Sequence, residues 1–131
     1  KRLDVNNKFR IRNFEFFLEN LDKEKYFTKF LIKGSCNYAL IIIFNKKYRN
    51  LKFRSKFEKE LFKKRIEYRR GLAGGGNQVK QAYLKFYNNK FKISGKLKNT
   101  EIIHNYGYYI GNYPSLKKNK ILNICKILNK I

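Results

Sequence analysis

The stretch Tyr38-Ala-Leu-Ile-Ile-Ile-Phe44 decides the fold of this 131-residue chain. It is the longest apolar run, and its β-branched and aromatic side chains are typical of a β-strand. A strand without polar alternation is usual where both faces of a sheet are covered, so we expect residues 38–44 to form a buried strand. The run is far too short to cross a bilayer.

Three apolar stripes with helical spacing predict helices on either side of this strand. The stripes are Phe14, Phe17, Leu18 and Leu21; Phe53, Phe57 and Leu61; and Ile121, Ile124, Cys125 and Leu128. We expect the first helix to span about residues 6–21. Asn50 and Ser115 are the expected N-caps of the other two, because their side chains can accept a backbone N–H.

Two more segments, 66–69 and 106–111, have the composition of short strands, and residues 25–33 suit an extended edge. Residues 81–87 fit either a short helix or an extended piece, and both readings stay open. Residues 88–99 are polar and basic, so we expect an exposed excursion. The order predicts an α/β domain, in which three or four strands carry helices on one face. The open face, with the first helix, should expose an apolar patch.

Length and charge limit the possible functions. The chain suffices for a single domain over 1–131 and is too short for two. Its net charge of +23 suggests a nucleic-acid-binding module, which we keep as the alternative. However, 24 of the 32 basic residues are lysine, and they are spread along the chain together with many Asn and Ile, as in a biased genome. A binder should instead gather Lys and Arg on one face beside exposed aromatic side chains.

The remaining reactive residues predict neither a metal site nor a hydrolase. Cys36 and Cys125 lack metal-ligand spacing, and we expect both in the core of a reduced, cytoplasmic protein. His104 is the single histidine, and no carboxylate is predicted to orient it, so we expect a structural or surface role. The chain contains no Met, and we interpret it as processed or as a piece of a longer reading frame.

The loop over residues 69–81 is the expected functional site. Its glycines, Gly74, Gly75 and Gly76, allow the backbone to approach a ligand closely. Arg69 and Arg70 precede them and either bind an anionic group or end a strand in solvent. The amides that follow either hold ligand hydroxyls or satisfy loop backbone; they are Asn77, Gln78 and Gln81. We take these five polar residues as substrate-binding candidates and find no catalytic candidate.

Several of these segments together resemble the DegT/DnrJ/StrS family of sugar aminotransferases, which depend on pyridoxal 5'-phosphate (PLP). The residues that carry the resemblance are Arg12-Asn13, Leu21-Asp22, Asn37-Tyr38-Ala39-Leu40, Ile66-Glu67-Tyr68-Arg69, Gly76-Asn77, Gln81 and Tyr109-Ile110-Gly111-Asn112-Tyr113-Pro114. They occur in the family's order and cover nearly the whole chain. Ala82 departs from the pattern, since the family usually has proline there. The glycine-rich loop looks most like lipopolysaccharide-sugar members, which include keto-deoxyhexose 3-dehydratases.

The resemblance is to the family's C-terminal small domain, and it implies a mainly antiparallel sheet. It implies PLP as cofactor, a nucleotide-linked 4-keto-6-deoxy sugar as substrate, glutamate as amino donor in the transaminases, and a homodimer. The Schiff-base lysine, or the histidine that replaces it in dehydratases, would belong to the absent large domain. We therefore expect the chain alone to be inactive, with residues 69–81 closing the substrate side of the complete active site.

Overall fold

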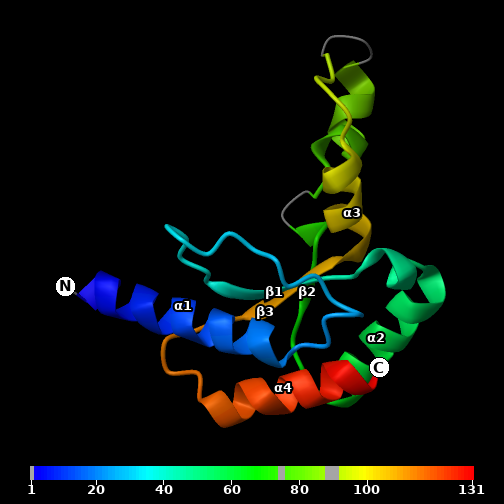
Figure 1. Cartoon of the computed structure of the whole chain (residues 1–131). Helices are drawn as coiled ribbons and strands as arrows, with labels where there is room; N and C mark the ends of the chain where they lie inside the picture. Colours follow the sequence, from blue (N-terminus) through cyan, green and yellow to red (C-terminus); the bar gives the residue numbers. More distant parts are fainter. Residues whose placement is uncertain (1, 74–75, 88–91) are drawn as a thin grey trace.

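The computed structural model describes residues 2–73, 76–87 and 92–131. Its helices are α1 (Arg2–Asn20), α2 (Leu51–Lys63), α3 (Lys98–Tyr106) and α4 (Lys118–Lys130), and its strands are β1 (Ala39–Ile43), β2 (Arg69–Arg70) and β3 (Gly107–Gly111). Three short 3₁₀ segments are η1 (Lys46–Tyr48), η3 (Gln78–Lys80) and η4 (Ala82–Tyr87). Figure 1 shows α1 and α4 side by side below the sheet, while α3 belongs to an arm that extends away from the body.

The three strands form an antiparallel sheet in the order β1-β3-β2. In its register, Leu40 lies opposite Ile110 and Ile41 opposite Tyr109. Arg69 of β2 also pairs with Tyr109, from the other side of β3. The expected α/β fold, a small antiparallel sheet with helices packed on one face, is confirmed.

Successive side chains of each strand point to opposite faces of this sheet, and the two faces differ in burial. Leu40 and Ile42 of β1 are fully buried against the helices, and Tyr108 and Ile110 of β3 join them there. Fully burying one such aliphatic or aromatic side chain stabilises the fold by about 1.5–3 kcal/mol. The predicted stripes of α1, α2 and α4 supply the opposing layer, so the core lies between the sheet and these helices.

A buried amide pair joins the first helix to the end of the sheet. Asn13 of α1 donates from Nδ2 to Asn112 Oδ1 at 3.2 Å, and Asn112 donates to the carbonyls of Arg10 and Asn37 at 2.9 and 2.8 Å. Both amides are almost fully buried. Asn13 and Asn112, which belong to two distant segments of the family resemblance, are therefore neighbours in space.

The structure corrects several expectations for the elements. The strand at 38–44 is packed against the helical layer on one face only, because Ile41 and Ile43 point away from α1, α2 and α4 and line a cavity. The expected strand at 66–69 pairs only at Arg69–Arg70, since α2 ends in a turn with Arg65 at φ 52° and residues 66–68 span the distance to the sheet. Segment 25–33 contributes one bridge, between Tyr26 and Phe44.

Some of the predictions for the helix N-caps and the cysteines are confirmed and others are wrong. Asn50 caps α2 as expected, accepting the N–H of Phe53 at 2.8 Å. Ser115 is not a cap: a turn closed by Leu116 precedes α4, which begins at Lys118. Cys125 is in the core, but Cys36 is exposed.

The connection from β2 to β3 was the least predictable part of the chain. The open choice for residues 81–87 resolves as the 3₁₀ helix η4. The expected excursion at 88–99 is exposed over 92–96, whereas residues 88–91 lie outside the described residues. Helix α3, which follows, was not predicted.

Candidate functional site

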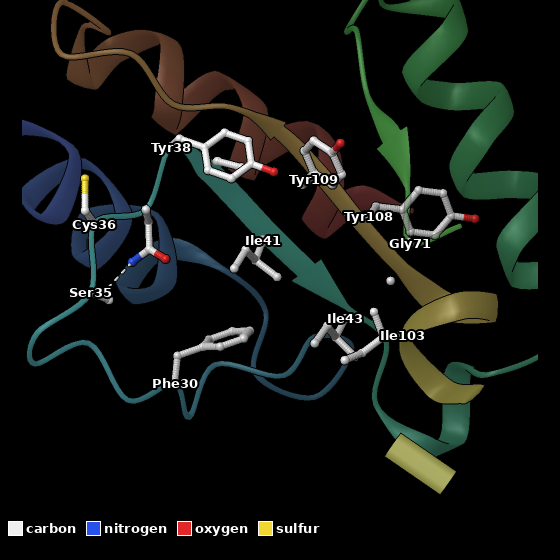
Figure 2. Close-up of a pocket in the computed structure, with 13 residues that line it drawn as sticks. Phe30, Ser35, Cys36, Tyr38, Ile41, Ile43, Gly71, Ile103, Tyr108 and Tyr109 are labelled. Atoms are coloured by element: carbon white, nitrogen blue, oxygen red, sulfur yellow. Dashed lines mark hydrogen bonds between the residues drawn. The ribbon is translucent and has the colours of Figure 1, made fainter. Parts of the chain in front are cut away.

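A cavity of about 520 Å³ lies on the sheet face that the helices leave open (Figure 2). Ile41 and Ile43 of β1, Phe30, Ile103 of α3 and Tyr109 of β3 surround it. None of its 13 lining residues is charged, although 31% of the chain is. The open face of the sheet therefore contains an uncharged hollow in an otherwise basic chain.

Apolar side chains of the first helix are also exposed. Leu3, Val5 and Phe9 of α1 are exposed. Beside the cavity, Tyr38 is exposed as well and makes an edge-on contact with Tyr109, their ring centroids 6.0 Å apart. These side chains add apolar area that the chain itself does not bury.

Arg69 lies at the edge of this open face. Its register opposite Tyr109 places both side chains on the same side of the sheet. The guanidinium is exposed and borders a smaller hollow of about 360 Å³ that Tyr38, Glu67 and Tyr109 also line. Among the five predicted polar residues, Arg69 therefore brings a positive charge to the margin of the apolar cavity.

Arg70, the next residue, points to the opposite side of the sheet. Its Nε lies 3.5 Å from Oε1 of Glu58 on α2, and the same carboxylate accepts the hydroxyl of Tyr108 at 2.5 Å. Burial and the carboxylate of Glu58 together raise the pKa of Tyr108. In this chain Arg70 joins β2 to α2, and it does not share the face on which Arg69 lies.

Asn77 has a structural role in the loop. It is 2% exposed, and its Oδ1 accepts the N–H of Val79 at 3.2 Å while its Nδ2 donates to Oε1 of Glu101. Its backbone N–H donates to Nδ1 of His104 at 3.1 Å. Through these hydrogen bonds, the side chain and backbone of Asn77 connect the loop to α3.

The other loop residues differ in what they could offer a ligand. Gln78 is exposed, and its Oε1 accepts the hydroxyl of Tyr83 at 2.5 Å. Gln81 is half-buried at the end of η3, where its N–H donates to the carbonyl of Gln78. Gly76 has a φ of +56°, which suits glycine. Gly74 and Gly75 lie outside the described residues.

Glu101 is a residue of this site that the sequence did not reveal, and His104, for which a structural or surface role was expected, accepts a hydrogen bond from the loop. The Glu101 carboxylate accepts from Lys80 Nζ at 2.6 Å, and Asn77 and Asn105 also donate to it. The hydrogen bond from Lys80 is the main reason that the pKa of Glu101 is lowered from 4.5. Both residues lie on α3, and without a predicted helix nothing in the sequence placed them beside the loop.

No family model matches the chain, and no curated protein matches its sequence. Solved structures do match its fold. They include a GDP-4-keto-6-deoxymannose-3-dehydratase with a trapped PLP-glutamate geminal diamine (TM-score 0.80, 20% identity) and the E coli GDP-4-keto-6-deoxy-D-mannose-3-dehydratase with bound hydrated PLP (0.82, 21%). A doubly substituted ColD matches with a TM-score of 0.77 and 20% identity.

Each of these matches covers 98% of this chain but only 32% of the solved one. The chain therefore spans about a third of the length of these enzymes and has the fold of that part. At this level of identity the likeness establishes the fold.

Proposed function

We propose that this chain is the small domain of a longer PLP-dependent enzyme that acts on a nucleotide-linked 4-keto-6-deoxy sugar. The reaction is either transamination or 3-dehydration of the sugar, in the biosynthesis of a lipopolysaccharide or another surface polysaccharide in the cytoplasm. In this proposal the active enzyme is a homodimer, and glutamate is the amino donor if the enzyme is a transaminase.

The observation that carries the proposal is the fold match, which covers nearly all of this chain and a third of PLP-containing sugar dehydratases. Two independent features support it. Two of the sequence segments that resemble the DegT/DnrJ/StrS family meet in the fold, where Asn13 donates a hydrogen bond to Asn112. The uncharged cavity on the open face of the sheet provides a surface on which a larger domain could pack.

The apolar cavity does not fit PLP by itself. The cofactor needs an amine and a group of phosphate-binding donors, whereas no lysine, arginine or histidine lines the apolar cavity. In the proposed enzyme the missing part of the polypeptide would therefore hold PLP, which supplies the electron sink for chemistry at the sugar carbon.

The role of this chain is to bind and enclose the sugar. Arg69 can donate a bidentate hydrogen bond to a phosphate or keto oxygen at the edge of the open face. Gln78 and Gln81 would hold hydroxyl groups, and Asn77 would keep the loop in place. Arg70 would stabilise β2 through its ion pair with Glu58 of α2.

The test uses the complete polypeptide that contains this chain, purified and supplied with PLP, glutamate and GDP-4-keto-6-deoxymannose. Mass spectrometry of the sugar should show either loss of the 3-hydroxyl or gain of an amino group. The isolated chain, the matched control, should leave the sugar unchanged and develop no PLP absorbance band of its own. An unchanged panel of nucleotide-linked keto sugars with the complete polypeptide would refute the proposal.

A further inference from the structure

His104 lies where α3 meets the loop that follows β2. Its Nδ1 accepts the backbone N–H of Asn77 at 3.1 Å. A ring nitrogen that accepts a hydrogen bond carries a lone pair, so the imidazole in this arrangement is neutral with its proton on Nε2. The observed contact therefore depends on the protonation state of the only histidine in the chain.

The loop backbone also packs closely against the ring of His104. Gly76 has a φ of +56°, and a Cβ added there would lie 2.4 Å from Nδ1 of His104. That distance is far inside van der Waals contact, so only glycine allows the ring and the loop to approach this closely. The segment Gly76–Lys80 and the ring of His104 thus form one packed unit.

The charged groups on the elements around the ring are few. They are Lys98 and Glu101 of α3, Lys80 of η3, and Arg69 and Arg70 of β2, while β1 contributes none. The pKa of Glu101 is lowered from 4.5, chiefly by Lys80, so this carboxylate stays ionised above about pH 5.5. Of the side-chain types at this contact, imidazole is the one that in general exchanges a proton between about pH 5 and 8.

We propose that His104 is a positioning residue for the segment Gly76–Lys80: its neutral ring holds the segment against α3, and protonation of Nδ1 releases it. A proton from solvent takes the lone pair of Nδ1, and the N–H of Asn77 loses its acceptor. The idea that this segment contacts a sugar rests on the proposed function. The idea that His104 positions the segment does not.

Amide hydrogen exchange of Asn77, followed by NMR on this chain at pH 7.5 and 5.5, tests the inference. Each rate is divided by the rate of an unstructured peptide at the same pH. Protection of Asn77 should fall about fivefold at the lower pH, as expected for the loss of one hydrogen bond. The N–H of Asp22, which donates to Oδ1 of Asn129 at 2.8 Å between the ends of α1 and α4, is the internal control and should not change.

Two variants distinguish a positioning role of the His104 ring from a general contribution of its side chain to folding. In His104→Asn the amide oxygen takes the place of Nδ1 and cannot titrate, so protection of Asn77 should be equal at both pH values. In His104→Ala it should be low at both. If His104→Ala does not fold, the first variant and the wild type still decide the matter. Protection in the wild type that does not change with pH, or an acid loss that persists in His104→Asn, would overturn the inference. No sugar is present in this measurement, so its outcome is independent of the proposed function.

Discussion

At the scale of single residues, the most consequential polar contact is the buried pair of Asn13 and Asn112. Neither side chain reaches water, and between them they hold α1 to the ends of β1 and β3. A buried amide that loses its partner costs the desolvation of a polar group, which is larger than the net gain from forming the bond. The pair therefore determines the register of α1 on the sheet.

Replacing one amide should be costly for that reason. We expect Asn112→Ala to lower the free energy of unfolding by about 1–3 kcal/mol, measured by urea denaturation. The matched control is Asn123→Ala on the exposed side of α4, which should change stability by less than about 0.5 kcal/mol. Equal small effects for both variants would show that the buried amide pair contributes little.

At the scale of elements, sequence patterns revealed those helices that bury an apolar stripe. The phenylalanines of α1 and α2 and the stripe of α4 point into the core, so their spacing is visible in the sequence. Helix α3 fully buries none of its nine residues, and its few apolar positions do not form a long stripe in the sequence. The strand β2 has only two residues, which is too short for an alternating apolar pattern to be visible in the sequence.

The same reason limits what could be predicted of the site. Residues 69–81 were recognisable from their glycines and polar side chains. That Arg69 and Arg70 point to opposite faces depends on the register with β3, and that Asn77 is buried depends on Glu101 and His104 of α3. These contacts join segments that are distant in sequence, and a local pattern carries no information about them.

Close packing of α3 on β2 gives a prediction for this element. A Cβ at Gly71 would lie 1.9 Å from the backbone oxygen of Ile103, so Gly71→Ala must displace α3. We expect the amides of α3 to lose most of their hydrogen-exchange protection while those of α1 keep theirs. Gly111→Ala is the control, since nothing lies within 4 Å of its Cβ position. Unchanged α3 protection in Gly71→Ala would contradict the close contact.

The contact of Glu101 with the loop should weaken in acid. Lys80 lowers the pKa of Glu101 below 4.5, so its stabilising effect is complete above pH 4.5 and is lost as the pH falls through the native-state pKa. Exchange protection of the Val79 amide, which donates to Asn77, should therefore decline below pH 4.5. Glu101→Gln should abolish this decline. An identical acid profile in the variant would assign the effect to another group.

At the scale of the whole molecule, charged side chains are spread over the surface and are absent from the lining of the apolar cavity. Exposed Lys and Arg residues lie on α1, α2 and α4, and the cavity on the opposite face of the sheet has none. Among the described residues, no helix has both the length and the apolar composition to span a membrane. The molecule thus combines a basic outer surface with one uncharged cavity, at whose margin Arg69 lies.

This distribution predicts weak binding of nucleic acid. A generic oligonucleotide should bind with low affinity and with a shallow dependence on salt, because dispersed lysines contact few phosphates at once. Fluorescence anisotropy between 50 and 200 mM salt measures the slope. Tight binding that weakens by about a thousandfold over this range would favour the nucleic-acid-binding alternative.

The account as a whole depends on this domain supplying the sugar side of an active site. The most direct test compares Arg69→Ala with Arg65→Ala, an exposed arginine in the turn after α2, in the complete enzyme. Arg69→Ala should reduce sugar turnover about tenfold or more, the effect of losing one charge-assisted hydrogen bond. Formation of 2-oxoglutarate from glutamate should stay unchanged, and Arg65→Ala should resemble the wild type in both reactions. Equal loss of both reactions in Arg69→Ala, or no loss in either, would contradict the account.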